Sequence, residues 1–298
     1  MTGTVLEREG STYRVLTAAG EVRAVLRGKL KREQPRVVVG DRVRLDDEGE
    51  HGMHGIAGVE ARTSLLARRV PEGRGTRPVA ANVDQVLVVA ATRDPAPIPQ
   101  LIDRLLVVAE ANQIAAAVIL NKIDLDPGTA LAERIGRAGY SVFRTSVKTG
   151  EGIAALRERL EGRESVVTGP SGVGKSSLLN VLEPGLALRT GEVSRRIRRG
   201  TNTTVSAVMV PLSAGGFLVD TPGFSEVGLW GLAPEELAHC FPEFRPLVAR
   251  CRFPDCSHVH EPGCAVISAA AGGAVAPDRL ESYHALLAEL KGAPRHWE

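Results

Sequence analysis

The stretch TGPSGVGKSSLL, residues 168–179, decides how this sequence is interpreted. It fits the phosphate-loop pattern of a glycine, four residues and then Gly-Lys-Ser, between the apolar run SVV and the helical pattern KSSLLNVL. Glycines let the backbone N–H groups face phosphates, and the helix N-terminus adds a favourable dipole. We therefore expect a strand, a phosphate-binding loop and a helix here.

Two side chains of this stretch have expected roles in binding the phosphates. Lys175 should reach the β- and γ-phosphates, and the hydroxyl of Ser176 should ligate Mg²⁺. The expected phosphate-binding set is Gly169, Pro170, Ser171, Gly172, Val173, Gly174, Lys175, Ser176 and Ser177.

A second motif, VILNKIDL at residues 118–125, predicts that the base is guanine. Asp124 can accept hydrogen bonds from the guanine N1–H and 2-amino groups, which adenine does not offer in that arrangement. Asn121 would support the loop, and the Lys122 stem would pack on the ring. Further on, TSVKTG resembles the second base-binding loop of GTPases. The expected base-binding residues are Asn121, Lys122, Ile123, Asp124, Ser146, Val147 and Lys148.

Two later segments match the switch regions of GTPases. In DTPG, Asp220 is placed to hold Mg²⁺ through water, and the Gly223 N–H can sense the γ-phosphate. In RRGTNTTV, either Thr203 or Thr204 can close on Mg²⁺. The expected catalytic residues are Lys175, Ser176, Asn202, Thr203, Thr204, Asp220 and Gly223, with Ser176, Thr204 and Asp220 as Mg²⁺ ligands.

The order of these motifs differs from that of an ordinary small GTPase, in which the phosphate loop precedes the base reader. Here the order is base reader, second base loop, phosphate loop, switch one and switch two. This indicates a circular permutation, which is tolerable because the termini of compact domains lie near each other. Switch two then leads directly into the C-terminal part of the chain.

The rest of the chain predicts three domains. Residues 1–75 contain five short alternating stretches, which favour a small barrel with an OB-fold as the leading candidate and another small barrel as the alternative. Residues 70–82 look like a linker. Residues 76–231 alternate apolar strands and helices, which is typical of a doubly wound α/β domain. Residues 232–298 look mostly helical, with Leu280, Tyr283, Leu287 and Leu290 on one face of a closing helix.

Composition and charge narrow the class of protein, its location and its possible partners. The 298 residues are 43% hydrophobic and 24% charged with a net charge of +2, which fits a globular protein with a core. No apolar run reaches the ~18 residues of a membrane span, and the N-terminus lacks a signal core, so we expect a cytoplasmic protein with no membrane partner.

Basic clusters at residues 21–44 and 194–200 favour a polyanionic partner over merely solvated faces. Tyr13 is the one aromatic residue in the barrel segment, so we expect RNA contacts through phosphates and not through base stacking.

A cysteine-rich segment near the C-terminus predicts a metal site. Cys251, Cys256, His258 and Cys264 form a Cys₃His set that suits tetrahedral structural Zn²⁺, with no open position for catalysis. His260 could replace His258. Cys240 lies outside the motif and should pack as a small apolar residue.

The full set of motifs resembles the RsgA (YjeQ) family of circularly permuted GTPases, which depend on the small ribosomal subunit. The likeness includes RGKLKRE, VVVGDRV, ANVDQVLVV, NKIDL, TGPSGVGKSSLLN, DTPGF and CRFPDCSHVHEPGCAV. It implies an N-terminal OB-fold, a central GTPase domain and a C-terminal zinc domain. It also implies binding to the small ribosomal subunit and its rRNA during late maturation, with subunit-stimulated hydrolysis of GTP to GDP. The family motif favours His258 as the histidine ligand.

The chain departs from the family pattern at the position before its switch-one threonines. The family usually carries a histidine there, whereas this sequence has Asn202, which can hydrogen-bond a water but does not titrate near neutral pH. Many GTPases have a glutamine soon after the switch-two glycine, which positions the attacking water. Here Phe224 follows Gly223, and the resemblance implies that this family uses a hydrophobic residue at that place. We expect slow intrinsic turnover.

Three functions are compatible with these motifs. The first is a GTPase that docks on the small ribosomal subunit, for which a monomer suffices. The second is an RNA-binding assembly factor that uses GTP as a conformational ligand with negligible turnover. The third, an ATPase or small-molecule kinase, is disfavoured by the NKID motif.

Overall fold

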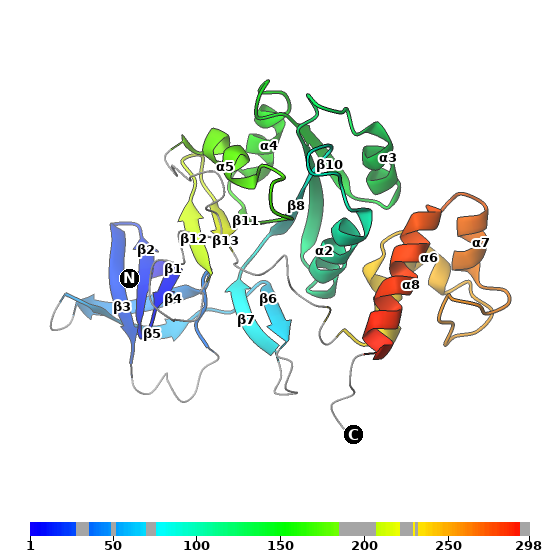
Figure 1. Cartoon of the computed structure of the whole chain (residues 1–298). Helices are drawn as coiled ribbons and strands as arrows, with labels where there is room; N and C mark the ends of the chain where they lie inside the picture. Colours follow the sequence, from blue (N-terminus) through cyan, green and yellow to red (C-terminus); the bar gives the residue numbers. More distant parts are fainter. Residues whose placement is uncertain are drawn as a thin grey trace.

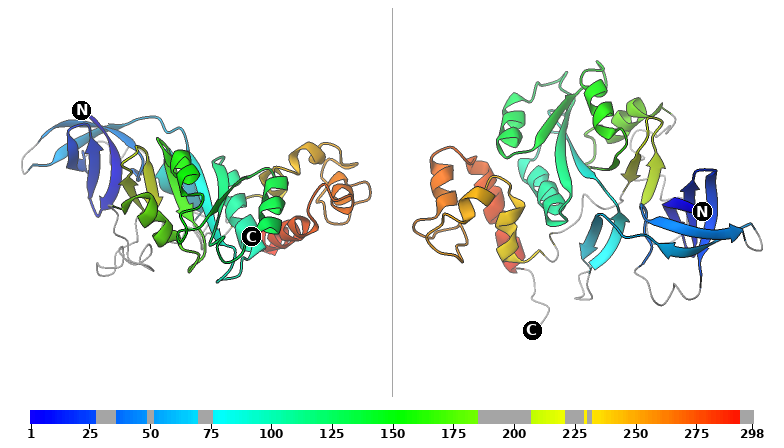
Figure 2. Two further views of the ribbon diagram at one scale, coloured as in Figure 1. Left: turned by 90° about the horizontal axis from the view of Figure 1, so that it is seen from above. Right: turned by 180° about the vertical axis from the view of Figure 1, so that it is seen from behind.

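The computed structural model describes residues 1–27, 36–48, 52–69, 76–184, 207–220, 229 and 232–292. Three regions lie in a row: a β-barrel, a central α/β region, and a C-terminal region of helices and loops (Figures 1 and 2). Among the described residues, no helix has the length and apolar character needed to cross a membrane.

The N-terminal region is a closed five-stranded barrel, as predicted. Its strands are β1 (Thr2–Glu9), β2 (Thr12–Thr17), β3 (Gly20–Leu26), β4 (Arg42–Glu48) and β5 (His54–Val59). They pair in the order β1-β2-β3-β5-β4, and an additional β1–β4 pairing closes the barrel. Alternating residues such as Val5, Val15 and Ile56 fill its core. Tyr13 is 1% exposed within that core, so it offers no face for base stacking.

The central region is built on a sheet whose long strands are parallel. The strands run in the order β10-β9-β8-β11-β13-β12, and β12 is antiparallel to β13. Their bounds are β8 (Gln85–Ala91), β9 (Ala115–Asn121), β10 (Ser141–Thr145), β11 (Glu164–Thr168), β12 (Val208–Pro211) and β13 (Phe217–Asp220). All seven residues of β8 are buried, which agrees with a strand covered on both faces.

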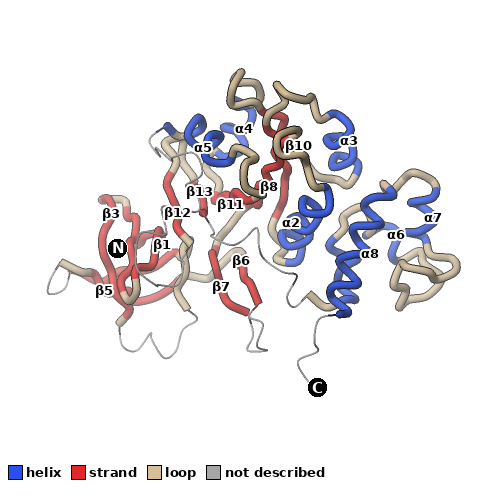
Figure 3. The backbone as a smooth tube through the Cα atoms, in the orientation of Figure 1, coloured by secondary structure: helices blue, strands red, loops and turns tan. Residues whose placement is uncertain are grey.

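Helices cover both faces of this sheet, as Figure 3 shows. The helices are α2 (Pro99–Ala111), α3 (Thr129–Arg137), α4 (Ile153–Leu160) and α5 (Lys175–Leu182). Residues of α2 and α3 pack with Val86, Val88 and Ala90 of β8, whereas α4 and α5 pack with the alternate residues Leu87 and Val89. The doubly wound arrangement is therefore confirmed.

A β-hairpin lies between the barrel and the sheet, where the sequence predicted a linker over residues 70–82. It consists of β6 (Leu65–Arg69) and β7 (Thr76–Ala81), so the linker prediction is wrong for β7. Leu66 and Ala80 are fully buried, and Ala80 also bridges Val39 of the barrel region. The hairpin spans both sides of position 75, where composition predicted a domain boundary.

The barrel and the central sheet form one continuous sheet of 11 strands. β12 pairs with β1 through Glu7 and Val208, so the last strand of the central sheet meets the first strand of the barrel. This pairing holds the barrel at the β12 edge, away from β9 and β10.

The C-terminal region contains the 3-10 helix η4 (Pro234–Cys240) and helices α6 (Arg245–Val248), α7 (Ala265–Ala271) and α8 (Pro277–Gly292). Tyr283 and Leu287 of α8 are buried, and Leu280 and Leu290 pack partly buried against the same core, so the predicted face is confirmed. Tyr283 meets the stacked rings of Phe241 and Phe244 at centroid distances of 5.4 and 5.3 Å.

Buried ion pairs join this region to the central helices. The Asp103 carboxylate of α2, fully buried, accepts hydrogen bonds from Arg134 of α3 at 3.0 and 2.6 Å and from Arg279 of α8 at 2.8 Å. Arg279 also forms two bonds to Glu243, at 2.6 and 3.0 Å. Burial alone would raise the pKa of Asp103, but the bonds from Arg134 and the charges of Arg279 and Arg134 outweigh it and hold that pKa below its usual value.

Replacing Asp103 should destabilise the protein strongly, because Asp103→Asn removes the carboxylate that two buried guanidinium groups share and leaves Arg134 with only the partly exposed Asp278 and Arg279 with Glu243. We expect a loss of about 3–5 kcal/mol in the free energy of unfolding, measured by urea titration with circular dichroism. Because the folded pKa is depressed, this contribution is present above the ordinary aspartate pKa and is lost as the pH falls below it.

The matched control is Glu289→Gln, which removes an exposed partner of Arg104 between the same two helices. We expect this change to cost at most about 1 kcal/mol. Equal losses in the two variants would contradict the importance of the buried network.

Candidate nucleotide site and metal centre

The loop of residues 169–174 joins β11 to α5 and depends on glycine at two positions. Gly169 has a φ of +142°, and a Cβ there would lie 2.1 Å from the Val89 carbonyl oxygen. Gly174 has a φ of +94°, and a Cβ there would lie 2.5 Å from Asn121 Nδ2. The backbone can therefore follow this path only without side chains at these positions.

Lys175 and Ser176 begin α5 directly after this loop. The Lys175 ammonium group donates to the Gly169 and Pro170 carbonyl oxygens at 2.7 and 2.6 Å, so it lies over the loop. Ser176 is 8% exposed. The first N–H groups of a helix have no partner within the helix and point toward the loop that precedes it.

Asn121, at the end of β9, links three predicted segments of the site. Its side-chain amide donates to the Val173 carbonyl oxygen at 2.9 Å, and its side-chain oxygen accepts from the Thr145 hydroxyl at 3.2 Å. The side chain is buried, with 2% of the residue exposed. It therefore connects the base-reading loop with the phosphate loop and with β10.

Lys122 crosses from the same loop to the phosphate loop. Its ammonium group donates to the Gly172 carbonyl oxygen at 2.8 Å and also to the carbonyl oxygen of Asp94. The long side chain therefore spans the gap between two loops that lie far apart in the sequence.

The predicted second base loop contacts Asp124 directly. The hydroxyl of Ser146, a fully buried residue, donates to Asp124 Oδ1 at 2.6 Å and accepts from the Thr149 N–H at 3.2 Å. Val147 is partly buried against the α4–α5 side of the sheet, whereas Lys148 is exposed. Ser146 thus orients the carboxylate of an exposed Asp124.

Several expected residues fall outside the described part of the chain. These are Asn202, Thr203, Thr204, Gly223 and Phe224, together with residues 28–35 of the first basic cluster and all of the second. Asp220 ends β13, which lies parallel to and beside β11, so its backbone is at the same edge of the sheet as the phosphate loop.

Two residues of this site were not among the functional residues predicted from the sequence motifs. Thr145 holds the Asn121 side chain, and Thr92 bonds the backbone of the base-reading loop. Both are polar residues at the carboxyl ends of apolar strands, which is where ligands bind in open α/β sheets. That position was the available signal in the sequence.

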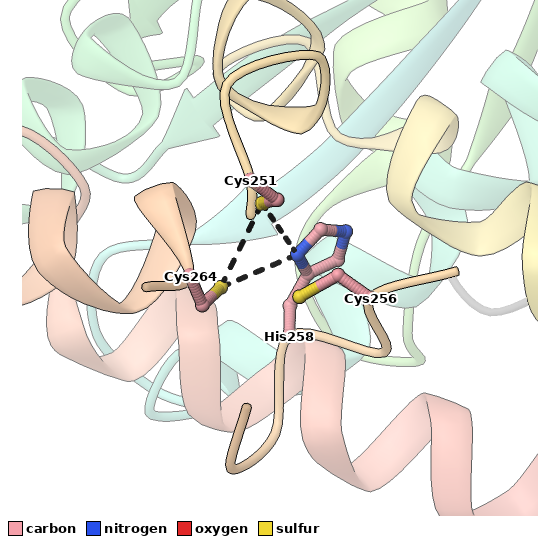
Figure 4. A group of neighbouring side chains, drawn as sticks. All are labelled: Cys251, Cys256, His258 and Cys264. Carbon is pink, nitrogen blue, oxygen red and sulfur yellow. Dashed lines mark hydrogen bonds between the residues drawn. The ribbon is translucent and has the colours of Figure 1, made fainter. Parts of the chain in front are cut away.

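The four predicted metal ligands come together in the C-terminal region (Figure 4). The Cys251, Cys256, His258 and Cys264 ligand atoms lie within 4.8 Å of one another. The Cys251 and Cys264 sulfurs are 3.9 Å apart, and His258 Nδ1 lies 3.5 and 3.4 Å from them. A tetrahedral zinc with ordinary bond lengths would separate two sulfurs by about 3.8 Å and a sulfur from a nitrogen by about 3.5 Å.

The surroundings of His258 hold it in place. Its φ is +58°, and its carbonyl oxygen accepts a bond from His284 Nε2 of α8 at 2.8 Å. Burial lowers the pKa of His258, which favours the neutral imidazole that a metal requires. His260 is exposed and lies outside the group, so His258 and not His260 completes the Cys₃His set.

Cys240 lies outside this group, as the sequence predicted. It is 5% exposed within the hydrophobic core, and burial raises the pKa of its thiol to about 12. An uncharged thiol in this setting packs as a small apolar side chain.

The chain is similar to known GTPases along nearly its whole length. A model of the RsgA GTPase family matches residues 59–230. A protein named small ribosomal subunit biogenesis GTPase RsgA from Gemmatimonas aurantiaca is 50% identical, with 98% of each chain covered. The protein of the same name from Moorella thermoacetica is 41% identical, with 97% of each covered.

Solved structures agree with these sequence matches. The crystal structure of YjeQ from Thermotoga maritima has a TM-score of 0.82 at 36% identity and covers 98% of this chain and 99% of its own. The structure of YloQ, described as a circularly permuted GTPase, has a TM-score of 0.78 at 29% identity, covering 99% and 96%. This chain therefore belongs to the RsgA GTPase family and is a GTP hydrolase with a circularly permuted GTPase domain.

Proposed function

We propose that this chain binds the small ribosomal subunit, assists its late maturation, and hydrolyses GTP with stimulation by that subunit. The observation that carries the GTP-hydrolysing part of the proposal is the contact between Asn121 of the base-reading loop and Val173 of the phosphate loop, which forms one nucleotide site from the permuted motifs. The names of the relatives from Gemmatimonas aurantiaca and Moorella thermoacetica support the ribosomal partner.

Within this proposal the residues at the carboxyl edge of the sheet hold the nucleotide. Asp124 reads guanine, Lys122 covers the ring, and Ser146 keeps the Asp124 carboxylate in position. Lys175 and the backbone of residues 169–174 bind the phosphates. Mg²⁺, held by Ser176, Thr204 and Asp220, would supply charge neutralisation at the phosphates.

The barrel is the proposed rRNA contact, through phosphates and not bases. Arg23 and Arg27, on and just after β3, have side chains that are 68% and 61% exposed. Exposed guanidinium groups suit phosphate oxygens, and Tyr13 is buried and unable to stack on a base. We infer that this molecule acts as a monomer in the cytoplasm.

Small ribosomal subunits should accelerate hydrolysis by the purified full-length protein. We expect phosphate release from GTP to rise about ten-fold or more on adding subunits, because an in-line water and positioned charges are completed only in the complex. Phosphate release is measured with and without subunits, and co-sedimentation reports binding. Binding without acceleration would instead support a GTP-dependent assembly clamp.

The same assay tests the residue that stands where the family usually has histidine. Asn202→Ala should lower the stimulated rate about ten-fold or more while GTP affinity stays within about two-fold, if Asn202 positions the attacking water. Asn202→His is the companion variant and should retain the stimulated rate. An unchanged rate in Asn202→Ala would assign water positioning to another group.

Asp124→Asn should reverse the base preference, because an amide offers a donor where guanine also presents one. We expect GDP affinity to fall about 100-fold and the affinity for xanthosine diphosphate, which has an oxygen in place of the 2-amino group, to rise. Titration with fluorescent nucleotides measures both. Asp126→Asn in the same loop is the control, since its side-chain oxygen accepts the Gly128 N–H; a similar GDP loss there would contradict the assignment.

We propose Zn²⁺ as the metal of the Cys₃His group, in a structural role. The purified protein should contain about one zinc per chain, and Cys256→Ser should lose it and lower the melting temperature of the C-terminal region. Atomic absorption and thermal unfolding are the measurements. Cys240→Ala is the control and should keep its zinc; a metal-free wild-type protein with unchanged stability would refute the site.

A further inference from the structure

Thr92, the first residue after β8, bonds the start of the base-reading loop although it belongs to none of the nucleotide-binding motifs. It is 8% exposed. Its N–H donates to the Asn121 carbonyl oxygen at 2.9 Å, and its hydroxyl donates to the Lys122 carbonyl oxygen at 2.9 Å. One residue just after the neighbouring strand therefore bonds the carbonyl groups of two consecutive residues, Asn121 and Lys122.

The bonded residue Lys122 has an unusual backbone. Its φ of +66° lies in the left-handed region, which is disfavoured for residues with a Cβ atom. Its carbonyl oxygen accepts both the Thr92 hydroxyl and the Leu125 N–H, at 2.9 Å each. The hydroxyl thus stabilises a backbone conformation that the lysine itself does not favour.

The same segment also holds the far end of the Lys122 side chain. The Lys122 ammonium group donates to the carbonyl oxygen of Asp94, two residues after Thr92, and to that of Gly172 in the phosphate loop. Residues 92–94 therefore bond Lys122 both at its carbonyl oxygen and at its ammonium group, and so restrain the aliphatic stem between these two ends.

Gly128, at the other end of the loop, lies close to the Thr92 methyl group. Gly128 has a φ of +63°, and a Cβ at Gly128 would lie 2.5 Å from Thr92 Cγ2. The loop that contains Asp124 consequently passes close to Thr92 at both of its ends.

We propose that Thr92 is a positioning residue for guanine recognition, which acts by holding Lys122 in its left-handed conformation so that the lysine stem faces the base. This inference rests on the proposed base-reading role of residues 121–124. It adds a third segment, residues 92–94, to the two loops that the sequence motifs identify.

The test compares GDP affinity among three variants of the full-length protein. Thr92→Val keeps the shape and removes the hydroxyl, and should weaken GDP binding about five- to ten-fold. Thr92→Ser keeps the hydroxyl and should stay within about two-fold of wild type. Thr92→Ala serves as the second hydroxyl-free variant if Thr92→Val does not fold, and should weaken binding at least as much.

Thr17→Val is the matched control. Thr17 is also 8% exposed, and its hydroxyl donates to the Gly20 carbonyl oxygen at 2.8 Å, but it lies in the barrel. It should lower thermal stability about as much as Thr92→Val without changing GDP affinity. Equal GDP affinity in Thr92→Val and Thr17→Val would overturn the proposal.

A double-mutant cycle with Lys122→Ala separates positioning from general support. If Thr92 acts through Lys122, the effect of Thr92→Val on GDP affinity should shrink to about two-fold or less in the Lys122→Ala background. Full additivity would overturn the proposal. A wild-type protein that binds ADP as well as GDP would overturn the guanine site itself, whereas a guanine-selective wild type with an unaffected Thr92→Val removes only the role of Thr92.

Discussion

The hydrogen bond from Asn121 to the Val173 carbonyl oxygen is the contact on which the nucleotide site depends, because it joins two loops that lie 52 residues apart in the sequence. In this chain the base reader precedes the phosphate loop, the reverse of the usual order. The contact survives because β9 and β11 lie on either side of β8, so their carboxyl ends meet at one edge. A permutation changes which loops connect the strands, but not where the strands end.

This constraint also explains why so much of the fold was predictable. Strands β8 and β9 are continuous apolar runs because both faces are covered, and α4 shows its inward face as Ile153, Leu156 and Leu160, all of which are buried. The Cys₃His spacing likewise identified the four side chains that meet. In each case a local pattern in the sequence has one dominant physical cause, so the pattern alone is enough to predict the strand, the buried helix face or the ligand set.

Where tertiary contacts outweigh local conformational preference, the sequence predicted the wrong structure or gave no motif. The hairpin strand β7 contains Pro78 and follows a glycine-rich stretch, so its composition resembles a linker. It is a strand because Leu66 and Ala80 are buried and because Ala80 bridges Val39. Thr92 belongs to no motif: the sequence shows only a polar residue at the end of an apolar strand, and the importance of Thr92 comes from a loop 30 residues away.

Helix α2 joins the central region to the C-terminal region and to the hairpin. Near its middle, Asp103 binds the C-terminal helix through Arg279; just after its end, the Asn112 side chain accepts the Ala67 N–H of the hairpin at 3.1 Å. Its preceding loop carries Thr92 and contacts the base-reading loop.

Two routes therefore connect the nucleotide site with the C-terminal region. One is the chain itself, which leaves β13 at Asp220 and enters η4. The other is α2, whose buried carboxylate holds Arg279. The residues that bond Lys122 lie in the loop before α2, and the carboxylate that holds Arg279 lies on α2 itself. One helix with its preceding loop therefore contacts both the C-terminal region and the base-reading loop.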